Sequence, residues 1–346
     1  MRFPSYFPLF AQTLLQRLRR LIPAVPKCAG TAVAWAAATS AFAAPPNFPN
    51  RPVEVVVPYS AGGGYDNFGR ALAAELQRAW NQPVVVQNRP GASEIIGAEY
   101  VKKAKPDGYT LFLGSEVALV TNPMIFRTLR YDPTTDFTPV TCMLEGQLVY
   151  ATRNGLGPTN LKEFIALARN SKDTVTYGSA GVGAVAHVAM GWMALQTGIK
   201  LSHVPYKGAA PILQDMLGKI VDSTVVPMGA IFPYLETHKL QAIGVTGPSR
   251  MAALPDVPTV TEQGYPSFDQ TFFLGIVAPA GTPLDIRRKI ATDIHAVISR
   301  PEFQAKYMTQ YGYLPVAGTP EAFETFLARD RDNRRKRIEP LGIKLD

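Results

Sequence analysis

Three consecutive glycines stand between a β-branched run and a helical pattern near the start of the chain. Residues 62–64 follow the run VEVVV (residues 53–57), and Asp66 begins a segment with helical spacing. Because glycine has no side chain, the backbone N–H groups of such a loop can approach a ligand closely, and the helix N-terminus adds a partial positive field. The loop therefore suits a carboxylate or a phosphate. A plain tight turn capped by Asp66 is an equally good interpretation of the triplet alone.

Further turns rich in glycine and serine occupy comparable places, each at the end of a predicted strand. They are residues 91–93, 114–115, 178–183 and 205–208. The first loop is neither a P-loop, because no Gly-Lys-Ser/Thr follows, nor the GxGxxG dinucleotide pattern. One such turn means little, but several at the carboxyl ends of strands predict a cleft lined by N–H and hydroxyl donors.

The sequence offers little for metal binding or nucleophilic catalysis. The four histidines, at positions 187, 203, 238 and 295, show neither HxxxH nor HxH spacing. Residues 178–181 do not fit the GxSxG pattern of hydrolases. For His187, contact with a ligand and plain packing are equally good interpretations, whereas His203 is expected to be structural. Cys142 lies in an apolar run and is expected to be a small buried hydrophobe.

Short β-branched runs alternate with amphipathic helices, which predicts parallel α/β sheets. Strands are expected at residues 53–57, 83–86, 110–114, 138–153 (two strands), 174–178, 200–205, 222–227, 241–246 and 271–279. Helices are expected at residues 66–79, 94–104, 160–170, 182–197, 208–217, 229–238, 284–299, 301–311 and 320–337. The series restarts near residue 150 and returns near residues 270–280. We therefore expect two α/β lobes, the first formed by residues 45–149 and 273–346 and the second by residues 150–272, with hinges near 148–151 and 270–274.

A basic and then apolar segment opens the chain. Residues 1–44 carry five basic residues and no acidic one, and the Ala-rich stretch 28–43 ends in Ala-Phe-Ala. We expect a signal peptide at residues 1–44, cleaved after Ala43 or Ala44, rather than a membrane anchor, for which the stretch is too short. Its removal leaves +3 of the formal net charge of +8, so nothing points to nucleic acid. One cysteine would then remain, so no internal disulfide is expected.

The ordered motifs resemble a known family. VPYSAGGGYD, QPVVVQNRPGA, KPDGYTLFLGS, YDPTTDF, YGSAGVGAVAH, HVPYKGAAP, LPDVPTVTEQGYP and APAGTP run from about residue 48 to the end, in the order and spacing of the extracytoplasmic receptors of tripartite tricarboxylate transporters, the Bug family. The resemblance implies an α/β, periplasmic-binding-protein-like type II fold with two lobes around a central ligand cleft. It implies a periplasmic receptor that captures a small organic solute, most often a carboxylate, for membrane transporter subunits. On this reading we expect a monomer with no catalytic residue, no cofactor, no metal and no nucleic-acid partner.

The resemblance also places the ligand-binding residues, which hold the solute through backbone N–H groups, hydroxyls and bridging waters. They are Tyr59, Ser60, Gly62, Gly63, Gly64, Tyr65, Asp66, Ser93, Ser115, Glu116, Ser179, Ala180, Gly181, Gly183, His187, Tyr206 and Lys207. In the mechanism we expect, the solute's carboxylate docks on residues 62–64, and Ser115 and Ser179 add hydroxyl donors. The second lobe then closes through residues 179–183 and 206–208.

This chain departs from the family pattern in its second loop. Where the family usually reads GAGGNIG, the chain reads GASEIIG, so that Ser93 and Glu94 replace glycines. Glu116, and with it Glu145, would lie near the cleft, where a carboxylate repels a second carboxylate on the ligand and attracts an amine. We therefore expect a monocarboxylate, an amino-acid-like solute or an aromatic acid rather than a tricarboxylate.

Three further interpretations stay open. The cleft could gain aromatic walls from Tyr59, Tyr65, Phe272 and Phe273, although core packing is at least as good an interpretation of the two phenylalanines. The basic run at residues 329–337 fits a solvated helix end better than a basic groove. A solute sensor for a membrane signalling partner, and an enzyme on the same scaffold, are the alternative functions.

Overall fold

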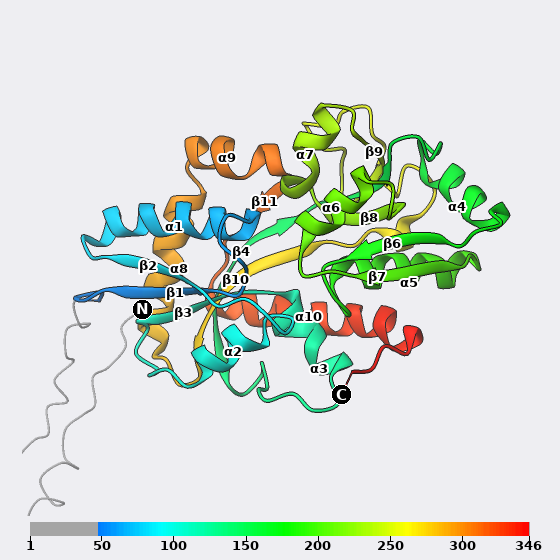
Figure 1. Ribbon diagram of the computed structural model, residues 1–346. Coiled ribbons are helices and arrows are strands. Elements are labelled where there is room, and N and C mark those ends of the chain that lie inside the picture. Colours follow the sequence, from blue (N-terminus) through cyan, green and yellow to red (C-terminus); the bar gives the residue numbers. More distant parts are fainter. Residues whose placement is uncertain (1–47, 346) are drawn as a thin grey trace, which may run out of the picture. The chain divides into compact units, whose positions relative to one another are not determined.

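The computed structural model describes residues 48–345, which belong to one compact unit that begins at Pro45. The expected signal peptide, residues 1–44, lies outside the described residues. The described part forms two β-sheets with helices on both faces (Figure 1). Among its helices, none is long and apolar enough to cross a membrane.

The first sheet has the strand order β11-β4-β10-β3-β1-β2, and the second has the order β7-β6-β8-β5-β9. The strands are β1 (Val53–Val57), β2 (Val84–Asn88), β3 (Thr110–Ser115), β4 (Phe137–Gly146), β5 (Leu148–Arg153), β6 (Val175–Ser179), β7 (Leu201–Pro205), β8 (Ser223–Pro227), β9 (Leu240–Val245), β10 (Phe272–Pro279) and β11 (Tyr313–Pro315). The α-helices are α1 (Gly64–Trp80), α2 (Ile95–Lys102), α3 (Asn122–Ile125), α4 (Leu161–Asn170), α5 (Val185–Thr197), α6 (Ala209–Leu217), α7 (Met228–Glu236), α8 (Leu284–Ile298), α9 (Pro301–Tyr307) and α10 (Pro320–Ile338).

Each sheet is mixed, so the prediction of parallel sheets is correct for only three strands of each. Strands β1, β2 and β3 are mutually parallel, as are β6, β7 and β8. An antiparallel strand that comes from the other half of the chain is inserted beside each set: β10 pairs with β3 and β4, and β5 pairs with β8 and β9. The chain thus passes between the sheets twice, first through the single residue Gln147 and then between β9 and β10.

Alternating side chains of β1 explain how the first sheet is covered on both faces. Val55 and its alternate neighbours pack in one cluster with Phe68 and Leu72 of α1 and with Ile290 of α8. Val56 packs on the opposite face in a second cluster with residues of α2 and α10. Figure 1 shows α1 and α2 on the two sides of this sheet. In the second sheet, Val149 faces the cluster of α6 and α7. Helices α4 and α5 cover its other face, with Phe164 and Met190 in the core.

Most predicted elements are confirmed to within a few residues, and the differences have local causes. Helix α5 begins at Val185 rather than at residue 182, because Gly183 has a φ of +79° that a helix cannot contain. The helix predicted over residues 301–311 ends at Tyr307 and continues as a 3₁₀ turn. A π-helical turn at Val117–Thr121, helix α3 and the three-residue strand β11 were not predicted from the sequence.

Candidate ligand-binding site

The expected ligand-binding residues lie at the carboxyl ends of parallel strands and in the loops and first helical turns that follow them. Tyr59 to Asp66 connect the end of β1 to the first turn of α1, Ser93 follows β2, and Glu116 comes directly after Ser115, the last residue of β3. In the second sheet, the residues from Ser179 to His187 join β6 to the first turn of α5, and Tyr206 and Lys207 follow β7. Because the carboxyl ends of parallel strands share one edge of a sheet, each group gathers at one edge.

The loops of the two sheets approach one another. A Cβ built on Gly181, which follows β6, would lie 3.9 Å from Ser93 Oγ in the loop after β2. A Cβ on Gly64, at the start of α1, would lie 3.3 Å from the Tyr313 hydroxyl, and one on Gly229, in the first turn of α7, would lie 3.4 Å from the same atom. The structure therefore brings the strand-end loops of both sheets face to face.

The glycine loop is held by Asp66. Its buried carboxylate accepts hydrogen bonds from the Gly62 N–H (2.8 Å), from Arg70 Nε (2.9 Å) and from Asn88 Nδ2 (2.7 Å). Burial opposes ionisation, but these hydrogen bonds outweigh it and lower the pKa of Asp66. The Asp66 carboxylate therefore serves the loop itself, and Gly62 adopts the φ of +83° that favours glycine.

The remaining donors of this loop belong to the first turn of α1. Gly63 is the residue before the helix, with φ −75° and ψ 165°, and its own N–H makes a long contact of 3.4 Å with Ser60 O. Gly64 and Tyr65 begin the helix, where N–H groups have no intrahelical carbonyl to bind. The exposed residues 62–64 thus surround the amino end of a 17-residue helix, which is a suitable place for an anionic oxygen.

The loop after β2 holds a buried carboxylate, that of Glu94, which is 4% exposed. Its Oε1 accepts hydrogen bonds from the hydroxyls of Tyr59 and Ser115, and its Oε2 lies 3.4 Å from the Ser115 N–H. Ala92, Ser93 and Glu94 all have a positive φ, of 46°, 51° and 71°. This left-handed run is unusual for residues other than glycine.

Two buried carboxyl groups at this edge have raised pKa values. Burial, and to a lesser extent the nearby Glu116, raises the pKa of Glu94 to about 7, against the hydrogen bonds from Ser115 and Tyr59. Burial also raises the pKa of Glu116 to about 7, against the attraction of Arg334. The Glu116 carboxylate lies 3.3 Å from the N–H of Phe273. Burial, and then Glu94, raises the pKa of the Tyr59 hydroxyl, which therefore stays a hydrogen-bond donor.

In the second sheet, His187 and His203 stack face to face. Their ring centroids are 4.0 Å apart with an angle of 5°, and Tyr177 stacks on His203 at 5.0 Å. The Gly183 N–H donates to His187 Nδ1 (3.0 Å), so the neutral ring carries its proton on Nε2. Burial, and then His203, lowers the pKa of His187 to about 4.

Ser179 is hydrogen-bonded to this stack. Its hydroxyl lies 2.7 Å from Gly181 O and 2.6 Å from His203 Nε2, so it contacts both the backbone of its own loop and the imidazole ring. Of the other expected residues, Tyr206 donates its hydroxyl to Asp215 (2.6 Å), and Ser60, Ala180 and Lys207 are exposed.

The expectations about neighbouring residues have mixed outcomes. Phe272 and Phe273 are 1% exposed, which confirms core packing, and Cys142 is buried as expected. The basic run is not simply a solvated helix end, because Arg334 pairs with Asp330 (2.6 Å) and donates to Thr271 O (2.9 Å). His203 was expected to be structural, whereas the structure places it beside Ser179 and His187.

Glu94 was missing from the expected site, although a charged residue in a glycine position was a signal for it.

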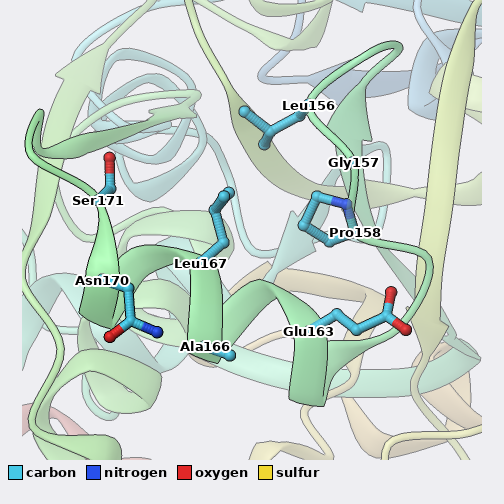
Figure 2. Close-up of a pocket in the computed structure, with 8 residues that line it drawn as sticks. All are labelled: Leu156, Gly157, Pro158, Glu163, Ala166, Leu167, Asn170 and Ser171. Carbon is cyan, nitrogen blue, oxygen red and sulfur yellow. The ribbon is translucent and has the colours of Figure 1, made fainter.

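The described residues contain no group of three or more His, Cys, Asp or Glu side chains that could hold a metal ion. A depression of about 470 Å³ lies elsewhere, on α4 and the loop before it (Figure 2). Its lining includes Leu156, Glu163 and Leu167 and none of the expected ligand-binding residues. We therefore assign the site to the strand-end loops on chemical grounds.

The two mixed sheets share one order of corresponding strands, β2-β1-β3-β10-β4 in the first and β7-β6-β8-β5-β9 in the second. The chain passes between the sheets twice, and their strand-end loops face each other. This arrangement defines a type II periplasmic solute-binding protein. The comparisons with known proteins agree. Residues 68–343 match the family described as tripartite tricarboxylate transporter family receptor. Protein BugT of Bordetella pertussis is 31% identical over 312 residues, which cover 89% of this chain and 95% of that protein.

Solved structures give the same result. The periplasmic binding protein BugD superposes with a TM-score of 0.78 at 31% identity, over 86% of this chain and 99% of that one. The structure of R. palustris Rpa4515 with adipate superposes with a TM-score of 0.81 at 31% identity, over the same shares. The chain belongs to the Bug family of tripartite tricarboxylate transporter receptors, whose members are periplasmic solute-binding proteins.

Proposed function

We propose that this receptor captures a small solute through a carboxylate in the periplasm, after export by residues 1–44, and presents it to the membrane subunits of a tripartite tricarboxylate-type transporter. The observation that carries the proposal is the amino end of α1, where exposed glycines at 62–64 face the loops of the second sheet. The structure of Rpa4515 with adipate supports a carboxylate as the recognised group. Binding without turnover is part of the proposal.

We further propose that the two sheets are the cores of two lobes, residues 45–149 with 273–346 and residues 150–272, whose boundaries lie within two residues of the starts of β5 and β10. The lobes would close on the solute about hinges near residues 148–151 and 270–274. Support comes from the two passages between the sheets, one of which is the single residue Gln147. Ser179 and the loop around Gly181, opposite Ser93, would then cover the bound solute.

The substitution Gly63→Val tests the site. Gly63 has an ordinary extended backbone, and a Cβ there would meet only Ser60 O at 3.5 Å, so the fold tolerates a side chain. The branched side chain would, however, cover the N–H groups at the start of α1. We expect affinity for the carboxylate solute to fall at least 100-fold, measured by calorimetric titration, with little change in the melting temperature.

Gly218→Val is the matched control. Gly218 has a φ of −74°, and a Cβ there would meet backbone oxygens at 3.6 Å, but it lies at the carboxyl end of α6, away from the strand-end loops. This variant should bind like the wild type. Unchanged affinity in the Gly63 variant would show that the solute does not dock on the amino end of α1.

A further inference from the structure

The hydroxyl donors nearest the glycine loop already bind a carboxylate of the protein itself. The hydroxyls of Tyr59 and Ser115 both donate to Glu94 Oε1, and the two oxygens are themselves 3.1 Å apart. The Ser115 N–H adds a third, longer contact of 3.4 Å with Oε2. Tyr59 and Ser115 were both expected to bind the solute, yet in the structure their hydroxyls already donate to Glu94.

The backbone around Glu94 has an unfavourable conformation, so other contacts must hold Glu94 in its position. Three successive residues, Ala92 to Glu94, have a positive φ, a conformation that glycine adopts readily and L-residues with a Cβ do not. Asn122 Nδ2 fixes the run by donating to Ser93 O at 2.8 Å, and the side-chain hydrogen bonds of Glu94 fix its end. Packing alone does not explain a buried carboxyl group here, since Glu94 makes polar contacts only with residues of the expected site.

A second carboxyl group reinforces the effect of Glu94. Glu116 is 3% exposed, follows Ser115 directly, and interacts electrostatically with Glu94. Tyr65, at the start of α1, interacts electrostatically with both carboxyl groups. A solute carboxylate brought to Tyr59 and Ser115 would have to displace Glu94 from its donors. It would also lie close to two carboxyl groups, which repel it in a site of low dielectric constant whenever they are ionised.

We propose that Glu94 is the specificity-determining residue of this receptor, because it withholds Tyr59 and Ser115 from a solute carboxylate and so excludes dicarboxylates. The preferred solute carries one carboxylate, bound at the amino end of α1, and an N–H donor such as a primary amide or an amine toward Glu94 Oε2. This inference rests on the proposed function and narrows its solute class.

Matched pairs of linear solutes test the inference by calorimetric titration at pH 7.5, with the protein purified after expression of the full chain. Each pair consists of a dicarboxylate and its monoamide of equal length: succinate and succinamate, glutarate and glutaramate, adipate and adipamate. In the pair that binds best, we expect the wild type to prefer the monoamide at least tenfold. Glu94→Gly should reduce that preference at least tenfold by freeing both hydroxyl donors.

Two further variants separate the causes. Glu94→Gln keeps the size of the side chain without its charge, so it should also lose most of the preference, which protects the test against misfolding of the glycine variant. Ala92→Gly relaxes the same left-handed run without touching the carboxylate and should keep the wild-type preference. Equal or tighter binding of dicarboxylates by the wild type, or an unchanged preference in both Glu94 variants, would overturn the inference and leave the receptor function intact. If no carboxylate binds to the wild type or to any variant, the proposed function itself fails.

Discussion

Three buried acidic side chains at the strand ends of the first sheet differ in what they face. Asp66 is surrounded by donors of its own loop, which lower its pKa. Glu94 also has three donors, but all three are uncharged, whereas Arg70 is one of those of Asp66. Burial raises the pKa of Glu94 and of Glu116 to about 7. The same chemical group therefore organises a loop in one place and, on our proposal, selects the solute in another. Only the surroundings of each carboxyl group separate the two roles.

The raised pKa of Glu94 has a consequence for stability. Its folded-state pKa lies above the usual value of 4.5, so the folded protein holds this proton more tightly than the unfolded chain does. The resulting stabilisation is complete below pH 4.5 and is lost as pH rises through 7. The groups that interact with Glu94 are Tyr59, Ser115, Glu116, Tyr65 and Tyr131, and only Glu116 titrates in the same range.

Glu94→Gln should therefore gain free energy of unfolding relative to the wild type as pH rises from 4.5 to 8, by at most about 3 kcal/mol for a shift of this size. Urea unfolding at intervals of one pH unit would measure the difference. Glu116→Gln should show a rise of the same sign, because burial raises that pKa too. Parallel stability curves for the wild type and both variants would mean that neither carboxyl group holds its proton in the folded state.

At the scale of elements, the passage from β4 to β5 is closely packed. Gly146 ends β4 beside Phe272 of β10, and a Cβ built on Gly146 would lie 1.9 Å from the Phe272 ring. Gln147 then links the sheets by donating its side-chain N–H groups to Thr246 O (2.7 Å) and Ser249 O (2.8 Å). On the return passage, Arg334 and Arg337 of α10 donate to Thr271 O and Asp269 O. Both passages are thus fixed by named contacts.

Gly146→Ala should destabilise the protein by about 3 kcal/mol, because the added methyl group collides with a fully buried ring that has no free space to occupy. The free energy of unfolding in urea measures the loss. Gly218→Ala is the control, since a Cβ there meets its neighbours at 3.6 Å, and it should be close to neutral. Equal stability of the two variants would show that Phe272 moves aside without cost.

The sequence predicted the regular elements well where the local pattern determines them. The run VEVVV forms β1, and the spacing of Phe68, Leu72 and Leu76 forms the buried face of α1. It did not predict that β10 and β5 run antiparallel to their neighbours, because strand direction depends on how distant segments meet. The π-helical turn after β3 and strand β11 were too short to produce a periodic pattern.

At the scale of the whole molecule, the family and the fold could be predicted from the order of many weak motifs. The interior of the site could not. Whether Asp66 contacts a ligand or its own loop, and whether Ser179 donates to Gly181 or to His203, depends on side-chain directions that spacing does not reveal. The ligand-binding residues and the boundaries of the two lobes therefore stay predictions, and a bound solute would test both together.

Calorimetric titration of the wild-type protein with monocarboxylates, dicarboxylates, tricarboxylates, amino acids and aromatic acids tests the central claim most directly, with each solute recovered and quantified afterwards. We predict saturable one-to-one binding of one carboxylate class, with all of the solute recovered unchanged. Failure of every carboxylate to bind, or consumption of the bound solute, would contradict the claim that this protein is a carboxylate receptor.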